Sequence, residues 1–172
     1  MDSKITSHII KGAILSGISI VISILVYIFN LYEASWLSWV NYGLFIGGLI
    51  YGGILFANQS DNNVSFGEVF THGFKTTSVV IVITVLFTIL SIKVIFPDMV
   101  DKVIEITRKK MLENPNMTDD MIEKAVNMTK QYFLPFALGG AIIGTGILGA
   151  LGSLLGAAFA KKNPNPFKDN VA

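Results

Sequence analysis

Long apolar stretches constrain this chain more than any other feature of its sequence. Four of them approach the length of about 20 residues that crosses a bilayer as a helix, and the last is also rich in glycine. Glycine inside a helix costs about 1 kcal/mol relative to alanine in water, whereas in a bilayer it lets neighbouring helices approach closely. The pattern therefore predicts an all-α integral membrane protein with transmembrane helices over residues 12–32, 37–57, 76–96 and 133–160.

The composition agrees with this class and excludes others. Only 15% of the 172 residues are charged and 52% are hydrophobic, whereas soluble domains carry about 25% charged residues. A net charge of +1 gives no strong attraction to nucleic acid. The absence of cysteine excludes disulfides, thiolate nucleophiles and cysteine-type zinc sites. We expect a single membrane domain over residues 1–172, with the lipid bilayer as its first partner.

The first apolar stretch has some features of a secretion signal, since Lys4 and Lys11 precede it. A signal peptide has an apolar region of roughly 7–15 residues followed by a cleavage site with small residues. Residues 12–31 form a longer run, and no such site follows them. We therefore interpret this stretch as an uncleaved first span.

A helix start is encoded just before the third span. Ser65 and Glu68 have the spacing of a capping box, in which each side chain bonds the backbone N–H of the other residue. The first turns are amphipathic and predict an interfacial segment that leads into span 3. An unbroken helix over 65–96 would be about 45 Å long, so we expect it to bend, at Gly73, or to protrude. The phenylalanines recur every four residues, at Phe66, Phe70 and Phe74, and the polar positions are Glu68, His72 and Lys75.

Residues 97–130 differ from the rest of the chain, since charges of both signs appear beside a helical stripe of apolar residues. Asn114 to Asn116 interrupt the stripe, and Thr118 is placed to cap a second helix. We predict an extramembrane amphipathic helical hairpin between spans 3 and 4. Span 4 is expected to begin near residue 133 with Pro135 in its first turn, and residues 163–172 are expected to be a disordered tail.

An even number of spans places both termini on one side of the membrane. The short loop 33–36 lacks Lys and Arg, whereas Lys11, Lys75, Lys161 and Lys162 lie against span ends. The full count of Lys and Arg on the two sides favours neither orientation, so these two details decide for cytoplasmic termini and a hairpin on the outside.

Glycine pairs at four-residue spacing mark candidate helix-packing faces. They bring helices together either among this protein's own spans, or in a homo-oligomer, or with another membrane protein. A leucine at Gly144 is expected to disrupt such a contact. The pairs are Gly43 with Gly47, Gly48 with Gly52, Gly140 with Gly144, and Gly152 with Gly156.

Chemical motifs are scarce. His72 with Glu68 is the one acid–base pair expected near an interface, and zinc requires three or four protein ligands. A GxSxG elbow and a phosphate-binding loop are missing. No ionisable residue lies at a span centre, which disfavours an ion-coupled transporter. We predict no catalytic, cofactor or metal site. The hydroxyl groups of the spans are expected to bond their own helices, and include Ser16, Ser19, Ser23, Thr84, Thr88 and Thr145.

Three segments carry a family resemblance: SFGEVFTHGF at 65–74, IFPD at 95–98 and MTDDMIEK at 117–124. With the four-span layout and the glycine-rich last span, the chain resembles domain-of-unknown-function family 4199, a family of small bacterial membrane proteins. The resemblance implies a multi-pass protein of the bacterial inner membrane. It implies no activity and transfers no functional residue.

The missing chemistry favours a non-enzymatic membrane accessory or scaffolding protein, which acts through helix packing and partner docking. The alternative function is a small oligomeric channel or transporter, with a pore lined by glycine and hydroxyl residues. A membrane enzyme acting on lipid would have to use Glu68 and His72.

Overall fold

The structure is a computed structural model that describes residues 5–163, and every regular element in that range is helical. Four of the helices are long and apolar enough to cross a membrane, counting α3 and η1 together. The predicted tail from residue 164 onward lies outside the described residues. The elements are α1 (His8–Ile28), α2 (Ser35–Gln59), α3 (Phe66–Leu90), the π-helical turn η1 (Ser91–Ile95), α4 (Met99–Leu112) and α5 (Asp119–Phe159).

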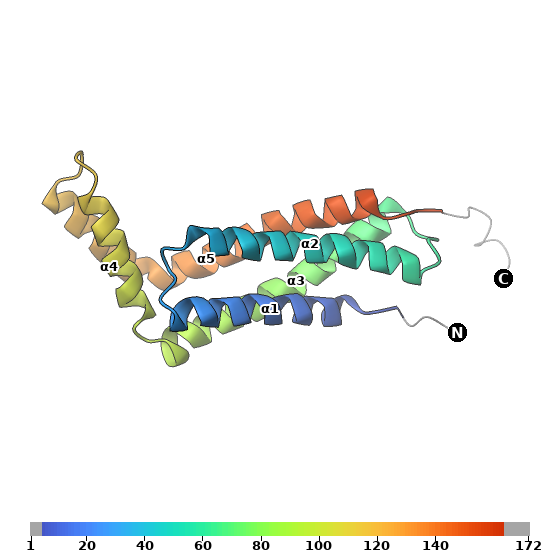
Figure 1. Cartoon of the computed structure of the whole chain (residues 1–172), viewed down its shortest axis with the longest axis horizontal. Coiled ribbons are helices and arrows are strands. Elements are labelled where there is room, and N and C mark those ends of the chain that lie inside the picture. The colour runs from blue at the N-terminus through green and yellow to red at the C-terminus, as the bar shows by residue number, and fades with distance from the viewer. Residues whose placement is uncertain (1–4, 164–172) are drawn as a thin grey trace.

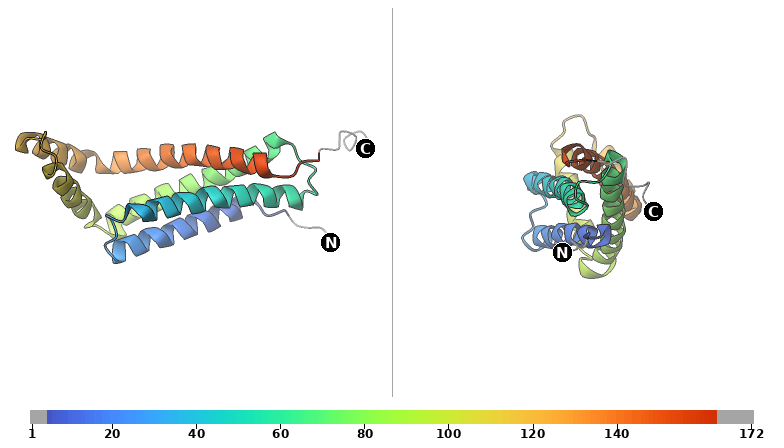
Figure 2. Two further views of the ribbon diagram at one scale, coloured as in Figure 1. Left: turned by 45° about the horizontal axis from the view of Figure 1, so that its top comes forward. Right: turned by 90° about the vertical axis from the view of Figure 1, so that its right-hand side faces the viewer.

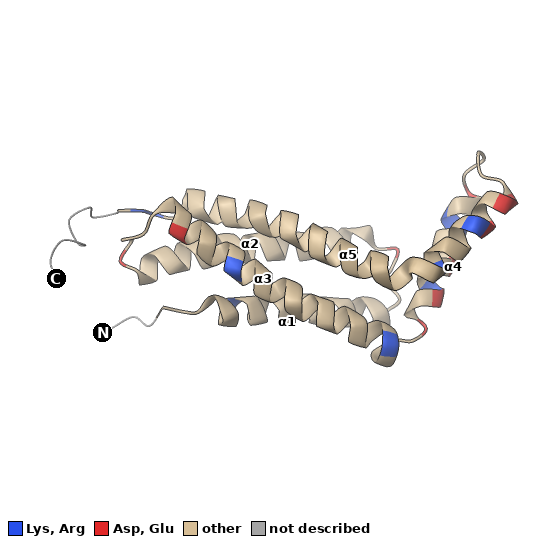
Figure 3. Cartoon of the chain, turned by 180° about the vertical axis from the view of Figure 1, so that it is seen from behind, with Lys and Arg blue, Asp and Glu red and all other residues tan. Residues whose placement is uncertain are grey.

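The four long helices lie side by side as an elongated bundle (Figure 1). The start of α1 and the end of α5 lie at one end, called here the terminal end. The hairpin of α4 and the first turns of α5 projects from the other end, called the hairpin end (Figures 1 and 2). Charged residues gather on the hairpin, and the long helices carry few (Figure 3). This separation matches the change in composition at residue 97.

Local signals set where the helices begin and end. The predicted capping box is confirmed: the Glu68 amide donates to Ser65 Oγ at 3.2 Å, and the Ser65 amide donates to Glu68 Oε2 at 2.6 Å. Thr118 caps α5 by accepting from the Met121 amide. Helix α1 ends at Ile28, before the predicted limit of 32, because Asn30 adopts the left-handed conformation that terminates helices.

Helix α5 corrects the prediction that a new helix begins near residue 133. It runs unbroken from Asp119 to Phe159, and Pro135 lies inside it rather than in a first turn. The change from polar to apolar composition marks a change of environment, which does not require a break in the backbone. At 1.5 Å per residue, this helix of 41 residues is about 60 Å long. The second arm of the hairpin and the apolar stretch predicted as span 4 are therefore one element.

The third span is continuous through Gly73. Gly73 lies within α3, and a Cβ atom built on it would come within 2.8 Å of Ser153 Oγ on α5. Its missing side chain therefore allows close helix packing. The backbone irregularity lies at the other end, in the π turn, where the Phe96 amide donates to Ser91 O at 2.8 Å.

The core occupies the terminal half of the bundle. Leu49, Val69 and Ala157 are almost completely buried there, on α2, α3 and α5. Helix α3 lies beside α5 at the terminal end and crosses toward α1 at the hairpin end (Figures 1 and 2). This crossing separates α5 from the other helices in the hairpin half, where few side chains of the bundle are buried.

Candidate functional site

Half of the eight predicted packing glycines contact other helices of this chain. A Cβ at Gly48 would overlap Leu15, one at Gly152 would lie 2.9 Å from Leu49 Cδ1, and one at Gly156 would lie 3.0 Å from Leu49 O. Gly52 lies in ordinary contact distance of Lys11. These close approaches join α1 to α2 and α2 to α5.

The other four glycines face open space. A Cβ on Gly43, Gly47, Gly140 or Gly144 would meet nothing within 4 Å in the described part of the chain. The expectation that a leucine at Gly144 disrupts helix contact therefore applies to contact with another molecule. Gly140 and Gly144 also line a cavity between the helices.

Ser65, Glu68 and His72 line one open pocket at the start of α3, but their polar groups make separate contacts. Glu68 is used in the cap of α3, whereas His72 Nε2 lies 3.0 Å from the Nζ atom of Lys11. Lys11 is 8% exposed and also donates to Gly52 O at 2.9 Å. The His72 ring stacks on Phe56 with 4.2 Å between centroids. The sequence did not reveal this pair, because Lys11 and His72 are 61 residues apart.

Residues 5–163 contain no evident metal-binding site. No group of three or more His, Cys, Asp or Glu side chains lies close enough to hold a metal ion.

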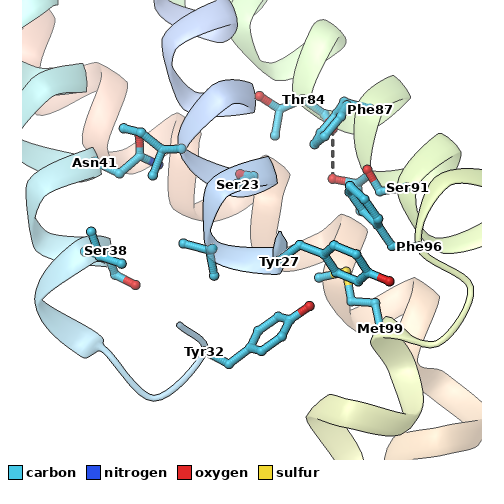
Figure 4. Close-up of a pocket in the computed structure, with 14 residues that line it drawn as sticks. Ser23, Tyr27, Tyr32, Ser38, Asn41, Thr84, Phe87, Ser91, Phe96 and Met99 are labelled. Atoms are coloured by element: carbon cyan, nitrogen blue, oxygen red, sulfur yellow. Dashed lines mark hydrogen bonds between the residues drawn. The ribbon is translucent and has the colours of Figure 1, made fainter. Parts of the chain in front are cut away.

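A cavity in the hairpin half, called here the main cavity, has a volume of about 290 Å³; two more open pockets beside α3 at the terminal end are larger. Helices α1, α2, α3 and α4, the π turn and the α1–α2 connection contribute to its walls (Figure 4). Apolar side chains cover much of the surface, among them Ile22, Val26, Leu37, Phe87, Phe96 and Met99. The small polar side chains in the wall are Ser23, Ser38, Asn41, Thr84, Thr88 and Ser91.

A second cavity of about 300 Å³ continues from the first. The two share Ser23, Asn41 and Thr84, and the second reaches Gly140 and Gly144 on α5. Ser19 Oγ donates to Asn41 Oδ1 at 3.0 Å between α1 and α2. The two cavities together form a hollow with small polar side chains, which reaches all four long helices.

A polar cluster fixes the hairpin to the rim of the main cavity. Tyr27 donates its hydroxyl to Asp98 Oδ1 at 2.5 Å, and Lys102 Nζ lies 3.0 Å from Asp98 Oδ2. Lys102 Nζ also lies 4.4 Å from the centroid of the Tyr27 ring, on which Phe96 stacks at 3.8 Å. The end of α1 is thus joined to the start of α4.

Electrostatics stabilise this cluster in its charged form. The hydrogen bond from Tyr27 and the contact with Lys102 lower the pKa of the Asp98 carboxyl below its usual value. The hydrogen bond to Asp98 raises the pKa of the Lys102 ammonium. Both side chains are partly exposed, so water screens their attraction.

Two hydroxyls in the wall of the main cavity are buried and make no hydrogen bond within residues 5–163: Ser91 Oγ and Tyr32 Oη. Burial raises the pKa of the Tyr32 phenol. Of the polar residues in this wall, the sequence indicated Ser23, Thr84 and Thr88, whereas Tyr32, Asn41 and Ser91 were not expected. For Asn41 and Ser91 the usable signal was a polar side chain inside an apolar stretch; Tyr32, between α1 and α2, gave none.

Comparison with known proteins gives a family but no activity. Residues 11–162 match a family model described as "Protein of unknown function (DUF4199)". Neither the curated proteins nor the solved structures contain a match. The match covers most of the chain and agrees with the resemblance of its segments at 65–74, 95–98 and 117–124. The chain therefore belongs to the DUF4199 family.

Proposed function

We propose that this protein is a non-enzymatic accessory or scaffolding protein of the bacterial inner membrane. Its four long helices cross the bilayer, its termini are cytoplasmic, and its hairpin stands outside. The apolar exterior of the bundle supports the crossing, and Lys11, Lys75, Lys161 and Lys162 at the terminal end support cytoplasmic termini. In this role the protein binds another membrane protein through its helices and presents the hairpin for docking.

The observation that carries the proposal is the open glycine face of Gly140 and Gly144 on α5. Glycine without a neighbour leaves helix backbone accessible, which is the condition for close approach by a helix of another chain. The chain's own packing uses other glycines of α5, such as Gly149 and Gly152. Gly140 and Gly144 instead line the hollow between α5 and the other helices, so a partner helix would reach them by entering that hollow.

The hairpin supports a docking role. Its arms pack through Ile122 and Val126, which are buried, and Lys130 pairs with Asp101 across them at 3.6 Å. Because α5 is continuous, a partner bound at the hairpin is mechanically connected to the bundle.

Photo-crosslinking in native membranes tests this function. A photoreactive residue at position 141, which lines the hollow with Gly140 and Gly144, should capture a different membrane protein whose helix enters the hollow, and Gly144→Leu should abolish that adduct. Gly146→Leu is the matched control, because Gly146 is also open but lies outside the cavity that Gly140 and Gly144 line. Recovery of self-adducts alone would contradict the accessory role.

The hollow between the helices favours one other function, a small oligomeric channel or transporter. Its small polar side chains reach all four long helices, as the wall of a solute path would require. Solute or ion flux into liposomes that contain only this purified protein would support transport. The absence of flux, together with a captured partner, would support the accessory role.

A further inference from the structure

We infer that the main cavity is a binding site for an uncharged amphiphile with two oxygen acceptors in its head group. Ser91 and Tyr32 donate hydrogen bonds to the head group, and the hydrocarbon part extends along the hollow toward α5. This inference does not depend on the proposed accessory role.

Ser91 is the strongest indication of a ligand. Serine and threonine in a membrane helix usually bond the carbonyl four residues earlier, as Ser16, Ser78 and Thr88 do here at 2.8–3.1 Å. Ser91 Oγ makes no such bond, although the residue is only 4% exposed. A buried hydroxyl without a partner is unfavourable, so a ligand oxygen at this position would relieve a cost already built into the fold.

The backbone around Ser91 also indicates that its unbonded hydroxyl has a function. Ser91 begins the π turn, and such turns in α-helices are frequent at functional sites. Tyr32 reaches the same cavity from the α1–α2 connection, with its hydroxyl directed toward Met99 and Tyr27 (Figure 4). The two unbonded hydroxyls therefore come from different walls, which suits a head group with two separate acceptors.

The chemistry of the walls excludes a charged head group. No Asp, Glu, Lys, Arg or His belongs to the lining of either cavity. The nearest charges, Asp98 and Lys102, lie at the rim and are paired with each other. Lys102 and Asp98 act on Tyr32 from the rim, but each is already the partner of the other, so a phosphate or an ammonium here would lose its hydration without a free counterion.

Size and polarity fit the head of a lipid-like molecule. The cavity volume of about 290 Å³ lies near the lower limit of small-molecule pockets, roughly 300 Å³. Its continuation of about 300 Å³ gives room for part of a chain. A diacylglycerol, through its ester carbonyls, and an isoprenoid quinone, through its ring carbonyls, share the required chemistry.

Photolabelling of the full-length protein in nanodiscs tests the site. Two probes are used: a diazirine-bearing diacylglycerol and a diazirine-bearing ubiquinone analogue. Mass spectrometry should locate the adduct on residues 84–99 or 22–38. An excess of the unlabelled ligand of the correct class, diacylglycerol or quinone, should compete with its probe for the cavity. Charged phosphatidylglycerol should not compete.

Variants separate the site from nonspecific labelling. Each of Ser91→Ala and Tyr32→Phe should reduce labelling roughly fivefold to tenfold, the effect of one hydrogen bond. Ser78→Ala and Tyr51→Phe are matched controls, because Ser78 bonds its own helix and Tyr51 is 65% exposed. Both controls should label like the wild type.

Ser91→Ala removes an unbonded hydroxyl, so the unliganded variant should fold with a thermal midpoint no lower than that of the wild type. Ser23→Phe fills the cavity and should abolish labelling by a second route. The inference is overturned if these variants label at wild-type levels, if phosphatidylglycerol competes equally, or if adducts are spread over the outer helix surfaces.

Discussion

At the scale of single residues, glycine has two different roles in one helix. Gly149 faces Thr77 so closely that a Cβ would overlap its side chain, and Gly73 faces Ser153 in the same interface. Gly144, between one and two turns earlier on α5, meets nothing within 4 Å in the described residues. The sequence pattern is similar at both positions, and only the neighbouring helix distinguishes them.

The same substitution is therefore expected to destabilise the protein at Gly149 and to have no effect on the monomer at Gly144. Gly149→Leu should lower the free energy of unfolding by about 1–3 kcal/mol, because it forces α3 and α5 apart. Gly144→Leu should leave the stability of the monomer unchanged. Thermal unfolding in detergent checks both, and equal losses at the two positions would refute the assignment of the interface.

The Tyr27–Asp98–Lys102 cluster predicts a pH dependence. The pKa of Asp98 is lower in the folded protein than in the unfolded chain, so its contribution to stability is present above the unfolded value of about 4 and is lost as pH falls through the folded value. The pKa of Lys102 is raised, so its contribution is lost only at strongly alkaline pH.

Amide hydrogen exchange at residues 96–102 should therefore accelerate, relative to the intrinsic rate, as pH falls below about 4. Asp98→Asn should abolish this acid dependence, and Asp101→Asn should preserve it, because Asp101 belongs to a separate pair with Lys130. An acid transition that survives in Asp98→Asn would assign the effect to other groups.

At the scale of elements, helix starts follow local chemistry, whereas helix continuity does not. Ser65 and Thr118 cap α3 and α5 as their sequence patterns predict. Pro135, by contrast, suggested a boundary that does not exist. A proline removes one backbone hydrogen bond and crowds the preceding turn, yet α5 continues through it.

Two substitutions compare these effects. Ser65→Ala should destabilise the protein by about 1 kcal/mol through loss of the cap of α3. Pro135→Ala should stabilise α5, because it restores an amide that can donate to Gln131 O. Thermal unfolding and hydrogen exchange at residues 131–139 measure both effects, and faster exchange in Pro135→Ala would show that the proline supports a required bend.

At the scale of the whole molecule, the bundle is closed at one end and open at the other. Close glycine contacts hold α2, α3 and α5 together at the terminal end. Toward the hairpin end α3 crosses to α1, and the hollow opens between the helices (Figures 1 and 4). The unbonded hydroxyls and the hairpin attachment both lie at this open end.

The proposed arrangement in the membrane can be tested with single cysteines, since the chain has none of its own. Asn116→Cys at the hairpin turn should react with an impermeant maleimide in spheroplasts whose inner membrane is intact. Asn163→Cys at the terminal end should react only after permeabilisation. Both positions are exposed, so equal labelling of the two would contradict their proposed location on opposite sides of the bilayer.

Sequence alone determined the helical class, the four long apolar helices, the caps at Ser65 and Thr118, and the family, because each depends on residues close together in the chain. The tertiary structure decided which glycines pack, why Lys11 meets His72, and where the hollow lies. Those features depend on how α3 crosses between α5 and α1. That crossing is a balance of many contacts between distant segments, and no local pattern encodes it.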